Sequence, residues 1–168
     1  GLGDAVLCAR KAVGDEPFAV LLGDSIIRTD DCTPFTKELV KAFDQYGRSV
    51  VGVQKMDRCL ISRYGVFEGA EFEKGVLHGK RVIEKPHEHE TTSDLVFCAR
   101  YVFGPELFGH LNDTRPGRNN EIQLTDAMQA LLTSNGLIGV ALEGERFDIG
   151  DPNGLLLANL SLTEFNCG

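Results

Sequence analysis

The sequence predicts an α/β fold built on a mixed β-sheet. Apolar, strand-like runs alternate along the chain with segments whose apolar residues recur at helical spacing. Phe18–Leu22 is an uninterrupted apolar run, as expected of a strand buried on both faces, and Phe35–Tyr46 is the clearest helix. Between Tyr64 and Glu84, short β-like runs alternate with glycines, which predicts a β-meander or hairpins inserted beside a parallel core.

The first part of the chain is predicted to run helix, strand, helix, strand. The first helix is expected over Asp4–Val13, with Asp4 as its N-cap and Gly14 as its stop. After the first strand, the second helix carries its apolar residues on one face and ends at Gly47. Ser49–Gln54 is the next strand. This strand–helix–strand order predicts a right-handed parallel crossover.

The rest of the chain continues the alternation without repeats or low-complexity tracts. The polar connection Pro86–Ser93 is expected to be an exposed loop. The further predicted elements are a strand at Leu95–Phe103, a helix around Leu124–Leu132 that Thr125 or Asp126 helps to start, a strand at Leu137–Leu142 and a final helix at Leu155–Phe165. Residues 1–168 are expected to form a single domain, since this length supports one sizeable core.

Composition narrows the class of protein. With 42% apolar and 25% charged residues the chain resembles an ordinary soluble globular protein. A net charge of −8, with Lys and Arg scattered along the chain, argues against binding to a nucleic-acid backbone. No apolar run approaches membrane-spanning length, so no membrane partner is expected. No basic-then-apolar signal opens the chain, although its first residue is Gly1 and not Met.

The cysteines and histidines show no metal-site spacing. The five cysteines form no Cys-x-x-Cys pair; they are Cys8, Cys32, Cys59, Cys98 and Cys167. Cys8 and Cys98 lie inside apolar stretches, where free cysteine behaves as a small buried hydrophobe. Reduced thiols favour a cytoplasmic location. His87 and His89 are expected to be solvated in their acidic loop.

A carboxylate after the first strand is the first candidate site. The apolar run ends abruptly at Gly23 and Asp24. In open α/β sheets, ligands bind beyond the carboxyl ends of the strands. A carboxylate there can hold Mg²⁺, the usual partner of substrate phosphates. Ordinary turn chemistry is the alternative for Gly23 and Asp24 taken alone.

The segment Val82–Pro86 delivers a carboxylate and an ammonium group side by side. Successive strand residues point to opposite faces, so Glu84 and Lys85 would diverge unless the strand end bends. A functional pair would use Glu84 to accept hydrogen bonds from hydroxyls and Lys85 as a point charge on phosphate. A solvated charge pair is the alternative.

Two further acidic residues follow a strand near the end of the chain. Asp148 and Asp151 flank a glycine, and one or both could complete a hard-cation site with Asp24. Asp151 precedes Pro152 and is expected to be a helix N-cap. For Asp148, a metal ligand and an Asx turn both stay open.

Two glycines could let a ligand approach the backbone. Gly65 enters the meander, and a plain hairpin glycine is its alternative reading. Gly1 precedes a helix, where main-chain amides can face a base or a phosphate.

Taken in order, six short segments resemble those of one known family. These segments are Gly1–Arg10, Phe18–Asp24, Ser62–Val66, Glu84–Pro86, Glu121–Asp126 and Arg146–Asp151. Together they resemble the bacterial UTP–glucose-1-phosphate uridylyltransferases, also called UDP-glucose pyrophosphorylases. The likeness is collinear over nearly the whole chain, which is more specific than any single match.

The resemblance implies a nucleotidyltransferase-type, Rossmann-like mixed sheet flanked by helices. It implies an enzyme that joins UTP and glucose 1-phosphate into UDP-glucose, releasing pyrophosphate with Mg²⁺ as cofactor. Asp24 and Lys85 would be catalytic. By resemblance, Asp24 and Asp148 would bind the metal, Glu84 the glucose hydroxyls, Lys85 the phosphates, the Gly65 amide the sugar, and Gly1 would lie against the uracil ring.

Departures from the family pattern accompany the likeness. The family usually has His, Asp, Gly and Cys where this chain has Asp4, Ser25, Asn120 and Ile149. Its Gly-rich, basic triphosphate loop is not found before Gly1, so the domain is expected to be incomplete at its N-terminus. Without those phosphate-binding groups, this segment alone is expected to have little or no transferase activity.

Two alternatives to this function stay open at the level of sequence. One is a non-catalytic module that binds a sugar nucleotide. The other is a nucleotidyltransferase that uses another base or sugar. Homo-oligomers are expected of the full-length form.

Overall fold

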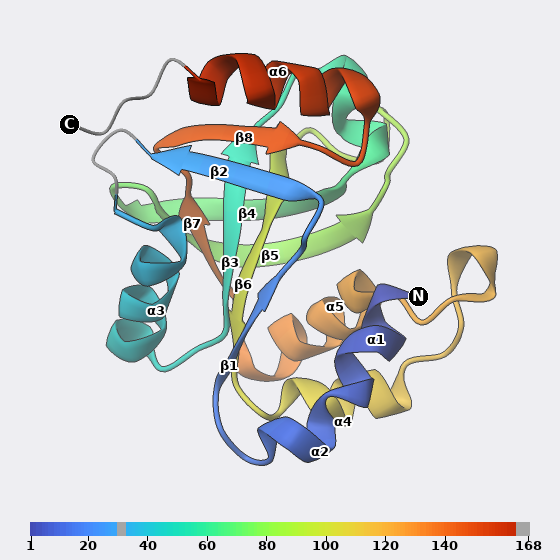
Figure 1. Ribbon diagram of the computed structural model, residues 1–168. Helices are drawn as coiled ribbons and strands as arrows, with labels where there is room; N and C mark the ends of the chain where they lie inside the picture. Colours follow the sequence, from blue (N-terminus) through green and yellow to red (C-terminus); the bar gives the residue numbers. More distant parts are fainter. Residues whose placement is uncertain (30–32, 164–168) are drawn as a thin grey trace.

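The computed structural model describes residues 1–29 and 33–163 (Figure 1). The elements in chain order are α1 (Leu2–Cys8), α2 (Arg10–Val13), β1 (Phe18–Leu21), β2 (Ser25–Thr29), α3 (Phe35–Tyr46), β3 (Val50–Lys55), the 3₁₀ helix η1 (Arg58–Arg63), β4 (Gly65–Glu73), β5 (Val76–Glu84), β6 (Leu95–Phe103), α4 (Leu107–Asp113), the 3₁₀ helix η2 (Arg118–Asn120), α5 (Leu124–Asn135), β7 (Ile138–Ala141), β8 (Gly144–Asp148) and α6 (Pro152–Thr163).

The large sheet has six strands in the order β1-β6-β3-β7-β5-β4. It is mixed, as predicted, because β3 and β7 are parallel while the other neighbours are antiparallel. Strands β1 and β3 run in the same direction, since each is antiparallel to β6. The expected crossover therefore joins strands of like direction, but β6 lies between them. The predicted meander is one long β4–β5 hairpin.

A second, two-stranded sheet was not predicted from the sequence. Strands β2 and β8 pair antiparallel, with Ser25 opposite Asp148, and α6 lies along this pair (Figure 1). The pairing joins segments more than a hundred residues apart, so no local pattern in the sequence predicts it. It brings the end of β8 beside the turn that follows β1.

Helices cover both faces of the large sheet (Figure 1). Helix α3 packs on one face, where Leu39 and Val50 are fully buried. Helices α1, α4 and α5 pack on the other, where Val51 and Leu131 are fully buried. Val50 and Val51 are adjacent in β3 and enter different clusters, as the alternation of a strand requires.

Several predicted boundaries are confirmed, and two helix starts are wrong: the last helix, predicted from Leu155, begins at Pro152, and the first helix also starts earlier than predicted. Helix α3 and strand β6 have the predicted bounds, and Gly47 ends α3 in the left-handed conformation with φ 60°. The first helix begins at Leu2, with Gly1 and not Asp4 at its N-cap. It is also divided at Ala9 into α1 and α2 before Gly14 ends it with φ 67°.

The prediction that the first strand is buried on both faces is wrong. Strand β1 lies at the edge of the large sheet and pairs only with β6. Its residues alternate between half-buried and exposed, and Leu21 is 54% exposed. Phe18 and Val20 pack against the core, whereas Ala19 and Leu21 are exposed, so only one face of the strand is covered.

The cysteine expectations are partly confirmed. Cys98 is fully buried, and burial raises the pKa of its thiol to about 12. Cys8 is exposed, so the expectation of burial is wrong there, because α1 turns that side outward. Cys32 and Cys167 lie outside the described residues, as does Phe165 at the predicted end of the last helix.

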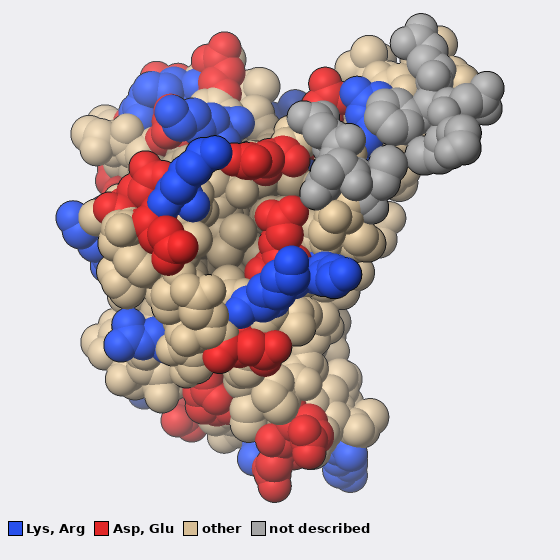
Figure 2. Space-filling view, turned by 90° about the vertical axis from the view of Figure 1, so that its left-hand side faces the viewer, with Lys and Arg blue, Asp and Glu red and all other residues tan. Residues whose placement is uncertain are grey.

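The surface carries both signs of charge. On the face drawn in Figure 2, Lys and Arg side chains are interspersed with Asp and Glu side chains. Within the described part of the chain, no helix is both long enough and apolar enough to cross a membrane.

Candidate active site

One cavity of about 250 Å³ gathers the predicted site residues. It lies between the large sheet, the small sheet and the start of α5, and Asp24, Gly65, Glu84, Lys85 and Asp148 all line it. These residues come from segments separated by up to 124 positions, and the fold brings them together. Gly1 does not line the cavity. It lies against Glu121 and Ile122, while the neighbouring Leu2 reaches the cavity wall.

Asp24 lies just before β2 and Asp148 lies at the end of β8, so both reach the cavity from the small sheet. Asp24 occupies the turn between β1 and β2, and its carbonyl accepts a hydrogen bond from the Ile149 N–H at 2.8 Å. A Cβ added at Gly150 would lie 3.5 Å from the Asp24 Cβ and 3.4 Å from the Asp148 Oδ1, so Gly150 is packed beside both. Among residues 1–29 and 33–163, no cluster of three or more metal-ligating side chains occurs.

Arg100 fixes the turn that carries Asp24. Its guanidinium donates to the carbonyls of Leu22 at 3.2 Å, Ala99 at 2.9 Å and Ser25 at 2.8 Å. Ala99 has φ 59°, a left-handed conformation that is rare for alanine and belongs to a bulge in β6. The bulge and the arginine together hold the 22–25 turn against β6.

Tyr64 bridges to the second carboxylate. Its hydroxyl donates to Asp148 Oδ2 at 3.0 Å. Burial, and then the hydrogen bond and charge of Asp148, raise the pKa of Tyr64, so the phenol stays protonated and remains a donor. The guanidinium carbon of Arg146 lies 4.7 Å from the centre of the Tyr64 ring.

A backbone bend brings Glu84 and Lys85 into the same cavity. Lys85 has φ 45°, which breaks the alternation of β5, and its N–H donates to the Tyr64 carbonyl at 3.1 Å. Its Nζ lies 3.9 Å from Glu84 Oε1. The buried Thr125 hydroxyl donates to Glu84 Oε2 at 2.6 Å. Thr125 therefore does not cap α5, whose N-cap is Gln123 without a side-chain bond.

Gly65 is required by close packing. A Cβ at this position would lie 2.6 Å from the Phe97 ring and 3.2 Å from Glu84 Oε2. Any side chain would therefore displace Phe97 or the Glu84 carboxylate. The open backbone beside the cavity follows from the same absence of a side chain.

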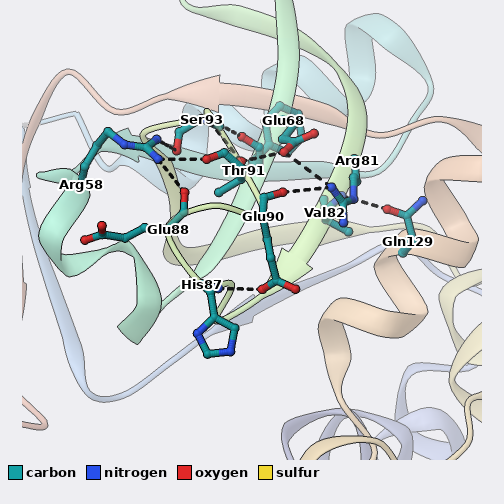
Figure 3. A network of polar contacts seen from close by, with 11 residues as sticks. Arg58, Glu68, Arg81, Val82, His87, Glu88, Glu90, Thr91, Ser93 and Gln129 are labelled. Carbon is teal, nitrogen blue, oxygen red and sulfur yellow. Dashed lines mark hydrogen bonds and ion pairs between the residues drawn. The ribbon is translucent and has the colours of Figure 1, made fainter.

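A polar network fastens the loop that follows Lys85 (Figure 3). Arg58 donates to three backbone carbonyls of this loop, those of Glu88, Thr91 and Ser93. Further hydrogen bonds of the network run from Arg81 to the Glu90 carbonyl, from Thr91 to Glu68, from Ser93 to the Phe67 carbonyl, from the Val82 N–H to Gln129 and from the His87 N–H to the Glu90 carboxylate, and Arg81 also pairs with Glu68. His87 and His89 are exposed, as expected, with their rings stacked at 5.7 Å.

Asp151 takes the structural role predicted for it. Its carboxylate accepts from the Asn153 N–H at 2.9 Å in the first turn of α6, and it lies 3.7 Å from Arg63. It does not line the cavity. Of the two acidic residues in that segment, only Asp148 joins Asp24.

Sequence reasoning missed several residues that form the cavity. Thr125 was assigned to a helix start, and Tyr101 and Arg146 were not singled out. Burial raises the pKa of Tyr101, which lines the cavity as a neutral phenol. The alternation of a strand through Asp148 would have placed Arg146 on the same face. Thr125 and Tyr101 face the cavity only because of tertiary packing.

Comparison with known proteins gives related sequences, while no protein-family model matches the chain. A UTP–glucose-1-phosphate uridylyltransferase of Staphylococcus haemolyticus is 37% identical over 156 residues, covering 93% of this chain and 54% of that protein. A relative from Methanocaldococcus jannaschii, which carries that name provisionally, is 40% identical over 162 residues, covering 96% of this chain and 56% of the relative.

Solved structures give the same result for the fold. A UDP-glucose pyrophosphorylase complexed with UDP-glucose matches with a TM-score of 0.94 at 34% identity, covering 98% of this chain and 62% of that one. The UTP-bound enzyme from Acinetobacter baumannii matches with a TM-score of 0.86 at 29% identity, covering 96% and 56%.

The chain spans a little over half the length of the curated relatives it matches. Within that span the mixed sheet and its flanking helices are those of the nucleotidyltransferase-type fold, as the sequence predicted. Over nearly its whole length, the chain is therefore a homologue of the UTP–glucose-1-phosphate uridylyltransferases.

Proposed function

We propose that this chain serves uridylyl transfer from UTP to glucose 1-phosphate, which gives UDP-glucose and pyrophosphate. The observation that carries the proposal is the single cavity in which Asp24, Asp148, Glu84 and Lys85 meet. The family of the relatives supports it, as do the UDP-glucose and the UTP bound in two of the matching structures. The chemistry needs positioning and charge neutralisation rather than a covalent intermediate.

Glu84 and Lys85 divide the recognition of a sugar phosphate between them. Thr125 occupies Glu84 Oε2, so Oε1 is the oxygen left to accept from sugar hydroxyls. Lys85 is the cation beside it and would neutralise the phosphate joined to that sugar. The Gly65 amide would contact the sugar, because no side chain separates the backbone from the cavity.

Asp24 and Asp148 fit the donor set of Mg²⁺. This ion is bound in proteins by one or two carboxylates, with waters and substrate phosphates as its other ligands. The Asp24 carboxylate has no hydrogen bond or ion pair to another described residue, so it is available to a cation. When bound, Mg²⁺ would supply charge neutralisation at the phosphates. Tyr64 would orient the Asp148 carboxylate through its hydroxyl.

Some expectations from the resemblance stay predictions. Gly1 as the residue against the uracil ring is one, since Gly1 lies outside the cavity. Homo-oligomer formation and a cytoplasmic location are others. Little or no transferase activity of these 168 residues alone is also a prediction, and UDP-glucose synthesis by the isolated chain would contradict it.

Binding of UDP-glucose tests the proposal directly. Calorimetric titration of UDP-glucose into the chain, with and without Mg²⁺, should show binding that Mg²⁺ strengthens. Asp24→Ala should remove the effect of Mg²⁺, and Glu84→Gln should weaken binding in both conditions. Asp15→Ala is the matched control, because Asp15 is exposed and does not line the cavity.

Two results would count against the proposal. Absence of UDP-glucose binding by the unmodified chain would contradict the assigned ligand. Equal Mg²⁺ dependence in the unmodified chain and Asp24→Ala would contradict the metal role of Asp24. Competition with other nucleotide sugars in the same titration reports on base and sugar selectivity.

A further inference from the structure

Arg146 is a cation of the cavity wall to which neither the resemblance nor the relatives assign a role. It lies in β8 opposite Ile27 of β2, two residues before Asp148, so the two side chains leave the strand on the same face. It lines the cavity together with Asp24 and Lys85. Its guanidinium carbon lies 4.7 Å from the centre of the Tyr64 ring, which holds the planar group over an aromatic face.

The other cations of the cavity wall have carboxylate partners. Lys85 lies 3.9 Å from Glu84, and Arg63 lies 3.7 Å from Asp151. Arg146 makes no ion pair within 4.0 Å with any residue in 1–29 or 33–163. Asp148 directs one oxygen to Tyr64 instead.

The Arg146 side chain also contains a buried donor that is not satisfied. Its Nε is buried and has no hydrogen-bond partner among the described residues. A buried polar group without a partner destabilises the native state. The residue as a whole is half-buried and lines the cavity, so its guanidinium, which makes no ion pair within the described residues, can pair with an anion that enters the cavity.

A phosphate group suits this arrangement, because it can pair with the guanidinium fork through two oxygens and still offer another oxygen to a second cation. The guanidinium presents its N–H groups in a rigid, planar fork that pairs with two phosphate oxygens, and Tyr64 fixes the plane of that fork. Lys85 supplies a second positive charge in the same cavity as a point donor. A phosphoryl group that contacts both the Arg146 guanidinium and Lys85 would have its charge neutralised.

We propose that Arg146 is a phosphate-binding residue of this cavity, acting together with Lys85 on the phosphoryl group of a sugar phosphate or nucleotide sugar. The identity of that ligand rests on the proposed function, whereas the phosphate chemistry rests on Arg146 itself. The competing view is that Arg146 only packs on Tyr64 and contributes to folding.

Three probes separate the phosphate role from a packing role: inorganic phosphate, glucose 1-phosphate and glucose. Each is titrated into the unmodified chain, Arg146→Gln, Arg146→Lys and the charge control Lys74→Gln, with native folding checked by circular dichroism. Lys74 is 90% exposed and lies outside the cavity. The unmodified chain should bind glucose 1-phosphate more tightly than glucose.

Arg146→Gln should weaken glucose 1-phosphate and phosphate binding about 10- to 100-fold and leave glucose binding unchanged. Arg146→Lys keeps the charge but loses the fork, so its affinity for both phosphates should be intermediate. Lys74→Gln should match the unmodified chain with all three probes. If Arg146→Gln does not fold, the comparison of Arg146→Lys with Lys74→Gln decides the question.

The proposal is overturned if the unmodified chain binds glucose 1-phosphate no better than glucose. It is also overturned if Arg146→Gln, or Arg146→Lys where that variant decides, retains full phosphate affinity or loses glucose affinity to the same extent. Its failure differs from failure of the proposed function. Absent UDP-glucose binding with an Arg146-dependent phosphate response would refute only the latter.

Discussion

At the scale of single residues, the cavity depends on side chains that orient other side chains. Thr125 holds one oxygen of Glu84 at 2.6 Å, and Tyr64 holds one oxygen of Asp148 at 3.0 Å. Each neutral donor holds one oxygen of its carboxylate partner and makes no bond to the other oxygen. Both carboxylates are thereby pre-organised before any ligand enters, which lowers the ordering cost of binding.

Thr125→Val should weaken sugar-phosphate binding without removing Glu84. The substitution keeps the shape of the side chain and deletes a hydrogen bond to a charged group, typically worth about 1.5–3 kcal/mol. We expect roughly a 10- to 100-fold loss of affinity for glucose 1-phosphate by calorimetry. Thr125→Ser should retain most of the affinity, because it keeps the hydroxyl. Equal affinities in Thr125→Val and Thr125→Ser would show that the bond does not position Glu84.

The protein should lose folding stability at alkaline pH because its buried Cys98 thiol resists ionisation in the native state. Burial raises the pKa of its thiol from 9.0 to about 12, so the native state retains a proton that the unfolded state loses between these values. Stability is therefore unaffected below pH 9 and falls as the pH rises towards 12. The expected slope is up to about 1.4 kcal/mol per pH unit for one proton.

Urea unfolding between pH 8 and 11 measures this effect. Cys98→Ala should give a shallower fall in unfolding free energy, because its share of the linkage is lost. Tyr101 keeps a residual slope, since burial raises the pKa of that phenol as well. An unchanged slope in Cys98→Ala would contradict the assignment.

At the scale of elements, the loop after β5 is held by its neighbours rather than by its own structure. Residues 86–94 form no helix or strand, yet Arg58 of η1 donates to three of their carbonyls (Figure 3). Helix η1 leads directly into Tyr64 and Gly65. One arginine thus joins the segment before β4 to the segment after β5, and Lys85 lies at the junction.

Arg58→Ala should loosen the 86–94 loop. Loss of three hydrogen bonds to carbonyls should increase amide hydrogen exchange in a peptide covering this loop, since local opening becomes easier. Glucose 1-phosphate affinity should fall as Lys85 becomes less fixed. Arg10→Ala on the exposed face of α2 is the control and should change neither measurement. Unchanged exchange in Arg58→Ala would mean that other contacts are sufficient.

At the scale of the whole molecule, one aromatic ring ties the hairpin to the centre of the large sheet. Phe67 of β4 is fully buried. Cβ atoms added at Gly69, Gly79 or Gly139 would each lie within 3.2 Å of its ring. The ring therefore fills the space that three glycines in β4, β5 and β7 leave open. The hairpin carries Gly65, Glu84 and Lys85, so this packing also supports the cavity.

Phe67→Ala should destabilise the protein by about 3–5 kcal/mol, because it removes buried apolar surface and leaves a cavity. Urea unfolding measures the change. Phe72→Ala on the same hairpin is the control: Phe72 is 43% exposed and its ring contacts Tyr46 and His78 at the edge of the core, so its loss should cost clearly less than that of Phe67. Similar losses for the two variants would contradict the central role of Phe67.

Much of the fold could be predicted because local periodicity determines where strands and helices form. The bounds of α3 and β6 follow from apolar spacing and from Gly47, all of which are visible along the chain. The small sheet of β2 and β8 could not be predicted, since strands so distant in sequence leave no local pattern. The edge position of β1 was missed for the same reason.

The candidate site, like the fold, could be predicted from the sequence only in part. The sequence by itself pointed to Asp24, Glu84, Lys85, Gly65 and Asp148 as candidates beside strand ends, and the collinear resemblance of six short segments to one family gave them their expected roles. Only the tertiary structure showed that they share one cavity, that Lys85 bends into it with φ 45°, and that Thr125, Tyr64 and Arg146 complete it. A side chain's direction depends on long-range packing, which sequence spacing does not encode.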